Sequence, residues 1–307
     1  MVTAAVVNFC SNDLPFLAPF LQQLSLAVSP IIIPVCDHFF DGSKEQKKLL
    51  ETAFSAHPEA FFLLYPFAPS CLPKSRSVDQ KHLWASVSRL LGYSFLPKNT
   101  SYTFFLDVDE IPEGNKLQSH IEAKELERYD FAQLGCYWYF REACYRADTW
   151  ESTPLVAKNS ALSKKLLLQK DERLGTYQQG RGIKNPHMLG QDQTPLFHHY
   201  SWVRTKEAMQ KKVASWGHSH ERNWADLVAE EFSKSFTGKD FVHGYSFQKV
   251  EPFCDFFVKK PAGSSEGNVV ELSKIDLFLI LHRPRWMYPF SLKEKISLAE
   301  NHFSIRS

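Results

Sequence analysis

The sequence has few of the features that mark disulfide-rich, membrane-spanning or nucleic-acid-binding proteins. Its six cysteines form no Cys-x-x-Cys pair, which argues against a zinc knuckle or a disulfide framework and favours thiols in a reducing compartment. No stretch approaches the roughly 20 apolar residues of a membrane span. With 36 basic and 34 acidic residues, the net charge of +2 gives no electrostatic footprint for nucleic acid. We expect no nucleic-acid partner and at most peripheral contact with a membrane.

The beginning of the chain also lacks the pattern of a secretory signal. Residues 4–9 read directly as a strand, without a basic region before them or an Ala-x-Ala cleavage site.

The chain has the composition of a globular protein. Its 307 residues, 44% of them hydrophobic and 23% charged, are enough to bury a large core. We expect a folded cytoplasmic protein.

The first hundred residues alternate between strand and helix patterns. Apolar runs suited to strands occupy residues 6–9, 31–36 and 61–65, and apolar residues recur at helical spacing over 16–28, 49–54 and 83–91. Ser43 is expected to cap the second helix. Strand–helix alternation with short connections predicts right-handed crossovers, a mostly parallel sheet with flanking helices and a crevice for a nucleotide.

The second half is less regular. Residues 131–140 alternate as a strand, 208–216 and 224–232 predict helices, and the polar, glycine-containing stretches 171–193 and 261–267 predict loops. Beyond about residue 240 we find no motif. We expect a domain over 1–240, with a nucleotide-binding half (1–115) and an acceptor half (116–240). An irregular C-terminal extension, 241–307, is expected to pack on the same domain.

The most informative segment runs from Tyr102 to Pro112. Its apolar residues predict a buried strand that ends at two carboxylates, Asp107 and Asp109, with one residue between them. Pro112 lacks a backbone N–H and prevents the hydrogen bonding of the strand from continuing. In open α/β sheets, ligands bind beyond the carboxyl ends of the strands. Two carboxylates at such an end can share one hard divalent cation. The alternative is a strand end with solvated acids.

Two motifs carry a resemblance to a known family. The string Leu106-Asp-Val-Asp-Glu-Ile-Pro112 is similar to the Asp-x-Asp-Glu-Ile-Pro segment of the bisecting N-acetylglucosaminyltransferase family. His199-Tyr-Ser-Trp202, followed by a lysine-rich helix ending near His218, resembles that family's His-x-Ser-Trp element. The likeness is strong over 102–114 and 197–220 and architectural over 1–100. It implies a GT-A fold.

The resemblance also implies an activity. It points to a metal-dependent glycosyltransferase that moves a hexosyl or N-acetylhexosaminyl group from a nucleotide sugar, expected to be a UDP-sugar, to a glycan or lipid-linked glycan acceptor with inversion. Mn²⁺ or Mg²⁺ would neutralise the leaving diphosphate. Asp109 is expected to bind the metal directly. Asp107 is expected either to bind the metal, directly or through a water molecule, or to hold the ribose. The family points to His199 as a further ligand; the adjacent His198 would project oppositely in an extended segment.

The remaining candidates come from position. Asn8, Asp13 and Asp37 lie just past strand ends and Arg89 lies on the helix before the Asp107 strand, so each is expected to contact the nucleotide unless it is a turn former or a solvated charge. Inversion needs a carboxylate base. Asp192, shortly before His199, is the first choice and Glu151 the second, among the acids that follow Asp109: Glu142, Asp148, Glu151, Asp171 and Asp192. Candidates for stacking on an acceptor sugar or meeting phosphate are Trp138, Tyr139, Trp150, Lys206, Lys211 and Lys212.

Two other functions share parts of this pattern. A phosphatase of the haloacid dehalogenase type also has a strand ending in Asp-x-Asp, with the first Asp as nucleophile. That motif usually opens its domain, whereas three strand–helix units precede Asp107 here. A non-catalytic GT-A-like domain that only binds a nucleotide sugar or glycan would retain the same residues.

Overall fold

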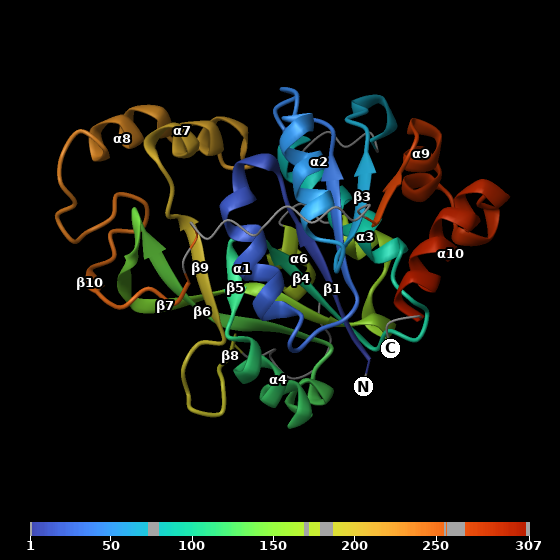
Figure 1. Ribbon diagram of the computed structural model, residues 1–307, viewed down its shortest axis with the longest axis horizontal. Helices are drawn as coiled ribbons and strands as arrows, with labels where there is room; N and C mark the ends of the chain where they lie inside the picture. The colour runs from blue at the N-terminus through green and yellow to red at the C-terminus, as the bar shows by residue number, and fades with distance from the viewer. Residues whose placement is uncertain are drawn as a thin grey trace.

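Strands from both halves of the chain join one mixed sheet (Figure 1). The computed structural model describes residues 2–72, 80–168, 172–178, 187–254, 256 and 268–304. In this part of the chain the strands run in the order β11-β3-β2-β1-β4-β7-β6-β9-β5, with β10 on β7 and β8 on β6. The strands are β1 (Thr3–Asn8), β2 (Ile31–Cys36), β3 (Phe61–Tyr65), β4 (Tyr102–Asp107), β5 (Glu110–Pro112), β6 (Phe131–Phe140), β7 (Glu142–Lys158), β8 (His187–Met188), β9 (Phe197–Trp202), β10 (Phe247–Lys249) and β11 (Asn268–Glu271).

Helices cover both faces of the sheet. They are α1 (Leu14–Leu24), α2 (Lys47–Ala56), α3 (Gln80–Ser94), α4 (Gly114–Glu122), α5 (Lys164–Leu167), α6 (Glu172–Gln178), α7 (Lys206–Ser215), α8 (Trp224–Glu231), α9 (Lys274–His282) and α10 (Phe290–Ser304). Figure 1 shows α7 and α8 at one end of the molecule and α9 and α10 at the other. The described residues contain no helix that is both long and apolar enough to cross a bilayer.

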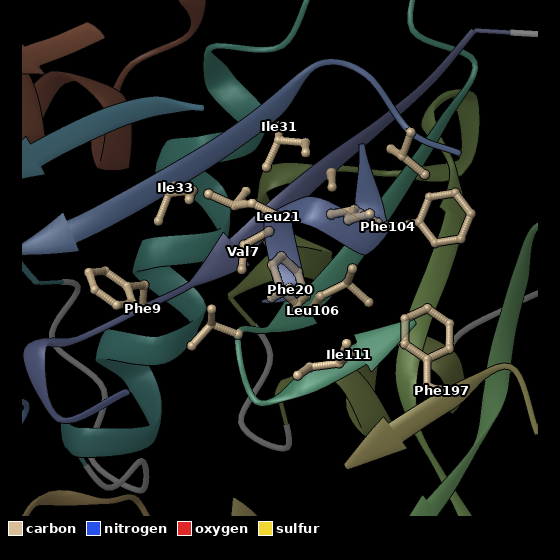
Figure 2. Packing of buried hydrophobic residues seen from close by; sticks show 14 of the residues in the cluster. Val7, Phe9, Phe20, Leu21, Ile31, Ile33, Phe104, Leu106, Ile111 and Phe197 are labelled. Carbon is tan, nitrogen blue, oxygen red and sulfur yellow. The ribbon is translucent and has the colours of Figure 1, made fainter. Parts of the chain in front are cut away.

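The core follows from the alternation of side chains along the strands. Successive residues of a strand point to opposite faces. Val7 and Leu106 therefore face α1, whereas Val6 and Phe105 face α3. Figure 2 shows the first of these layers, in which Val7, Leu106 and Ile33 meet Phe20 and Leu21 of α1. Both faces are apolar because both are covered, as expected of parallel strands.

The predicted α/β class is confirmed, with a large central sheet and flanking helices. β1, β2, β3 and β4 pair in parallel, as the strand–helix alternation predicts. The long strand β7 then runs antiparallel to both β4 and β6. Because β9 is parallel to β6, β9 runs in the same direction as β4. The carboxyl ends of β1–β4 and β9 therefore lie at one edge of the sheet.

Several local predictions were wrong or incomplete. Ser43 does not cap α2: the helix begins at Lys47, and the Ser43 hydroxyl donates to Asp41 in the preceding turn. The expected loop over 171–193 contains α6 and β8, while residues 179–186 lie outside the described part. The expected loop over 261–267 also lies outside it. The extension beyond 240 supplies β10, β11, α9 and α10, none of which the sequence patterns indicated.

Candidate active site

A cavity of about 510 Å³ opens at the carboxyl edge of the sheet. The last residue of each of five strands lines it: Asn8, Cys36, Tyr65, Asp107 and Trp202. The segment from α7 to α8 forms the opposite wall, with Lys212 and Trp216 among its lining residues. This is the position at which ligands bind in open α/β sheets. The cavity lies at the sheet edge where the Asp107 strand ends, and ligand binding there stays a prediction.

Asp107 is held by two arginines. One carboxylate oxygen lies 3.1 Å from Nη2 of Arg89 and the other 2.9 Å from Nη2 of Arg173. Arg173 also donates to Glu110, 2.6 Å away, and Glu110 accepts the backbone N–H of Asp107 at 2.8 Å. Burial raises the pKa of Glu110, but the guanidinium of Arg173 outweighs it and leaves the pKa below its usual range. These bonds fix the direction in which the chain leaves β4.

Asp109 is nearly buried, at 4% exposure, and faces three cationic or imidazole groups. Its Oδ2 accepts from Nη2 of Arg204 at 2.8 Å and from Nζ of Lys212 at 3.0 Å. Its Oδ1 lies 3.7 Å from Nε2 of His199. Burial raises the pKa of Asp109, but the charges of Lys212, His199 and Arg204 together hold it well below its usual range. Asp109 is therefore a carboxylate at neutral pH.

The two adjacent histidines of β9 point to opposite sides. His199 faces the cavity, where its ring packs edge-on against Trp138 with centroids 4.9 Å apart. His198 faces away, bonded to the Tyr139 hydroxyl at 2.7 Å and to Glu113 at 3.1 Å, and burial lowers its pKa. The structure thus brings His199, and not His198, to Asp109.

The ligand set that a divalent cation would meet is smaller than the sequence suggests. Both oxygens of Asp107 are bonded to guanidinium groups, so this residue does not fit as a direct ligand. Oδ1 of Asp109 has no bond to Arg204 or Lys212 and faces Nε2 of His199. A carboxylate oxygen and an imidazole nitrogen are ligands that suit Mn²⁺. Among the described residues, no three His, Cys, Asp or Glu side chains cluster to hold a metal. Of the predicted ligands, only Asp109 and His199 could hold a cation here, which would then need further ligands from outside the protein.

Glu151 of β7 lines the same cavity. It accepts from the Tyr245 hydroxyl at 2.9 Å, and Nδ1 of His243 lies 3.7 Å from the same oxygen. The Trp138 ring stands between His199 and His243, 4.9 and 4.8 Å from their centroids. Trp138 therefore links the Asp109 side of the cavity to the Glu151 side.

Asp192, the first choice for a base, lies elsewhere. It is in the turn before β9, where it pairs with Lys116 at 3.0 Å and accepts from Thr194. Since the cavity is at the carboxyl ends of the strands, a residue just before β9 lies at the opposite edge of the sheet. Among the other acids considered, Glu142 and Asp148 are not lining residues of the cavity, and Asp171 lies outside the described residues.

Of the four residues predicted to contact the nucleotide, three line the cavity and one does not. Asn8, Asp13 and Arg89 line the cavity. Asp37 instead accepts the backbone N–H of Phe67 at 2.6 Å and bonds His38, so it joins the loops that follow β2 and β3. Of the aromatic and basic candidates, Trp138 and Lys212 line the cavity, Tyr139 is in the core and Trp150 is exposed.

Sequence reasoning missed several residues that hold this site together. Arg204 bonds both Asp109 and Asp13, at 2.8 and 2.7 Å. It lies two residues past β9, so the strand-end argument used for Asn8 would also have found it. Arg173, His243 and Tyr245 follow no such pattern, because their partners are distant in sequence and no local signal marks them.

The buried carboxylates make stability depend on acid pH. Asp109 and Glu110 have lower pKa values in the folded chain than in the unfolded one. Their stabilising contribution is therefore complete above about pH 4.5 and is lost as the pH falls toward the folded-state values. We expect Tm to fall between pH 5 and pH 3, and to fall less in an Asp109→Asn variant. Glu51→Gln, on the exposed face of α2, should keep the wild-type dependence of Tm on pH. If Tm changes with pH equally in Asp109→Asn and in wild type, the lowered pKa of Asp109 does not contribute to stability.

Known proteins resemble this chain only remotely. No family model matches, and no curated protein matches. Among solved structures, that of S. aureus TarS 1-349 is similar, at 10% identity and a TM-score of 0.36, over 76% of this chain and 73% of that one. Likeness at this level carries no argument about the site. The resemblance to the bisecting N-acetylglucosaminyltransferase family stays a prediction from the two motifs.

Proposed function

We propose that the chain is a metal-dependent, inverting glycosyltransferase that acts in the cytoplasm and uses a UDP-sugar as donor. The observation that carries the proposal is one cavity with two chemically different walls. A carboxylate–imidazole pair and a lysine, Asp109, His199 and Lys212, form one wall, and a second carboxylate, Glu151, lies beyond Trp138 on the other. Glycosyl transfer needs both: cationic stabilisation of a leaving diphosphate and a base for the acceptor.

The donor would bind over the carboxyl edge of β1 and β4. Asn8, Asp13 and Arg89 line the part of the cavity nearest the first half of the chain, where base and ribose would lie. Asp109 and His199 would hold Mn²⁺ or Mg²⁺, which supplies positive charge to the diphosphate oxygens. The Lys212 ammonium, 3.0 Å from Asp109, lies close enough to the same place to bind a phosphate oxygen.

The acceptor would bind at the aromatic wall. Its hydroxyl oxygen would attack the anomeric carbon while the bond from that carbon to the diphosphate oxygen breaks. Glu151 would take the hydroxyl proton, so the carboxylate becomes a carboxylic acid and the nucleoside diphosphate leaves with the electron pair. Tyr245 holds the Glu151 carboxylate in place through its hydroxyl, 2.9 Å away. The acceptor is expected to be a glycan or a lipid-linked glycan.

Buried polar atoms without partners support a polar ligand. Within the described residues, the indole N–H of Trp138 and the amide oxygen of Asn8 are buried and make no hydrogen bond, and both residues line the cavity. An unsatisfied buried polar group costs about 1–3 kcal/mol. A sugar and a nucleotide carry acceptors for the indole and donors for the amide oxygen, so their binding would recover this energy.

The geometry is less favourable to the two rival functions. An aspartate nucleophile of the phosphatase type needs a free oxygen, whereas both oxygens of Asp107 are bonded to arginines. A binding domain would not need a carboxylate positioned across the cavity as Glu151 is. Incubation with UDP-, GDP- and TDP-sugars and Mn²⁺ separates the three. Release of nucleoside diphosphate supports transfer, hydrolysis of p-nitrophenyl phosphate identifies a phosphatase, and binding without turnover identifies a binding domain.

Asp240 is expected to matter for the base without touching substrate. Its carboxylate accepts four backbone N–H groups, those of Val242, His243, Gly244 and Tyr245, at 2.6 to 3.2 Å. It thereby holds the loop that brings Tyr245 and His243 to Glu151. In Asp240→Asn one carboxylate oxygen becomes an NH₂ group, which cannot accept a hydrogen bond. This group would face the backbone N–H groups that Asp240 binds, so the loop should shift. We expect transfer to fall about tenfold, mainly in kcat, and UDP affinity to stay unchanged.

A matched control separates this effect from general instability. Asp276→Asn removes the carboxylate of the capping box of α9, and Asp276 is not a lining residue of the cavity. It should cost about 1 kcal/mol of stability while leaving kcat unchanged. If Asp240→Asn and Asp276→Asn lower Tm and kcat alike, Asp240 has no positioning role.

A further inference from the structure

His199, one of the two residues that could hold a cation, has different surroundings at its two ring nitrogens. Nδ1 lies 3.4 Å from Oγ1 of Thr153 in β7, a residue that lines the same cavity. Nε2 lies 3.7 Å from Oδ1 of Asp109, which is too long for a hydrogen bond. Among the residues that the structure describes, Nδ1 therefore has a hydrogen-bond partner and Nε2 has none.

Glu110 is another acceptor close to the ring, but it takes no proton from it. Glu110 lies opposite His199 in the antiparallel pair of β5 and β9, so the two side chains share a face. Oε2 of Glu110 accepts from Arg173 and from the backbone N–H of Asp107. Oε1 is buried and makes no hydrogen bond within the described residues. In this part of the chain, Thr153 is thus the hydrogen-bond partner that orients the His199 ring.

β7 contains one extra residue where it passes β6. Gln133 pairs with Leu155 and Gly135 pairs with Ser152, so two steps along β6 oppose three along β7. Pro154 lies within this bulge. A residue without a backbone N–H suits a position at which the ladder is interrupted.

The bulge decides on which face of the sheet Thr153 lies. In a regular strand Thr153 would share a face with Leu155, whose side chain packs in the cluster around α3. Because of the extra residue, Thr153 lies instead on the face of Cys136, which belongs to the cluster around α1. Its hydroxyl is 3.4 Å from the sulfur of Cys136 and 3.4 Å from the His199 ring. The bulge therefore turns a hydroxyl toward the candidate site.

The Thr153 hydroxyl is able to accept the proton of His199. Burial raises the pKa of Cys136 to about 12, so Cys136 is a thiol at neutral pH. Whether the thiol or the hydroxyl donates in the contact between them, Oγ1 keeps a lone pair for an N–H of the imidazole. A neutral histidine that carries its proton on Nδ1 has a lone pair on Nε2, here facing the carboxylate of Asp109. Two electron-rich atoms that face each other in this way suit a cation between them.

We propose that Thr153 is a positioning residue, which keeps the proton of His199 on Nδ1 and leaves the Nε2 lone pair toward Asp109 for a divalent cation. A histidine that binds a metal through one ring nitrogen generally donates the N–H of the other to a fixed acceptor, which sets the tautomer and the ring orientation. The metal-binding part of this inference rests on the proposed function, whereas the position of the proton does not.

Nitrogen-15 NMR of the metal-free chain with labelled histidine tests the position of the proton. At about pH 8 an ordinary histidine is neutral, and the His199 signals are identified by their absence in His199→Gln. We expect the proton on Nδ1 in wild type and in Thr153→Ser, which keeps the hydroxyl. Thr153→Val keeps the shape of the side chain without the hydroxyl, so the share of the form protonated on Nε2 should rise.

Mn²⁺ affinity, measured by calorimetry in the presence of UDP, gives a second readout. Thr153→Val should weaken it about tenfold, the lower end of the cost of losing such a partner, and Thr153→Ser should restore most of it. Thr103→Val is the matched control, because it removes a buried hydroxyl that bonds Asn159 at 2.6 Å and does not line the cavity. This control should leave Mn²⁺ affinity unchanged. Tm of each variant checks that it is folded.

Two results would overturn the proposal. One is a wild-type His199 that carries its proton on Nε2. The other is a Thr153→Val variant that keeps the wild-type tautomer or binds Mn²⁺ as tightly as wild type does. If the wild-type chain with UDP binds no Mn²⁺, the metal dependence of the proposed function fails, and the NMR comparison of wild type with Thr153→Val still decides whether Thr153 places the proton.

Discussion

Replacing Asp109 with asparagine is expected to abolish metal-dependent release of nucleoside diphosphate, by at least about 10³-fold, and also to destabilise the fold. The activity should disappear because the amide no longer supplies an anionic oxygen opposite His199. The stability should fall by about 3 kcal/mol because Lys212 loses its carboxylate partner and Arg204 keeps Asp13 as its one carboxylate partner among the described residues. Mn²⁺ titration in the presence of UDP, turnover and chemical denaturation measure the three effects.

A second substitution distinguishes the causes. In Asp109→Asn/Lys212→Met the unpaired ammonium is gone, so part of the lost stability should return while turnover stays absent. Full Mn²⁺ affinity in Asp109→Asn would reject the assignment of this residue as a metal ligand. A strand end with solvated acids, the alternative that the sequence left open, does not describe Asp109, because this residue is buried and bonded to two cationic side chains.

Glu151→Gln is expected to lower transfer by about 10²–10⁴-fold, the usual contribution of a general base. Glutamine can still accept from Tyr245, so the wall of the cavity should keep its shape. UDP binding, measured by calorimetry, should be unchanged, because the Asp109 side of the site is untouched. The experiment needs a donor and an acceptor that give measurable wild-type transfer.

Asp192→Asn provides the matching comparison. Its carboxylate is bonded to Lys116 and Thr194 in the turn before β9, so the substitution should leave transfer within about twofold of wild type. A large loss in Asp192→Asn together with an active Glu151→Gln variant would reverse the assignment of the base.

The sequence predicted those parts of the fold that depend on local patterns. The strands over 31–36, 61–65 and 131–140 have the expected bounds, because each is a continuous or alternating apolar run that is covered by helices. β7 was missed because much of its outer half, from Glu142 to Ser152, is polar and partly exposed, so it carries no clear period. Its ladder with β4 and β6 stabilises it instead.

The site was predictable only where strand order could be inferred. Asp107 and Asp109 follow from the end of β4. His199 came from the resemblance to the glycosyltransferase family, and the alternation of side chains along an extended segment separated it from His198. Asp192 was misplaced because nearness to His199 in sequence was taken for nearness in space, although Asp192 lies in the turn before β9 and His199 lies within the strand and lines the cavity. Arg173 bonds Asp107 across 66 residues of sequence, and no local pattern specifies such a pair.

The pairing of β11 with β3 has a consequence for how the chain avoids aggregation during folding. Asn268–Glu271 adds four ladder positions to Phe61–Leu64, and Leu272 donates a further bond to Leu64. Without it, the strand Phe-Phe-Leu-Leu-Tyr would be an open edge of the sheet, the kind of strand on which other chains add and aggregate. Until Asn268–Glu271 is made, a growing chain carries this edge exposed. The C-terminal segment thus completes the sheet as a protective edge strand, and a shortened chain would present its most aggregation-prone strand to solvent.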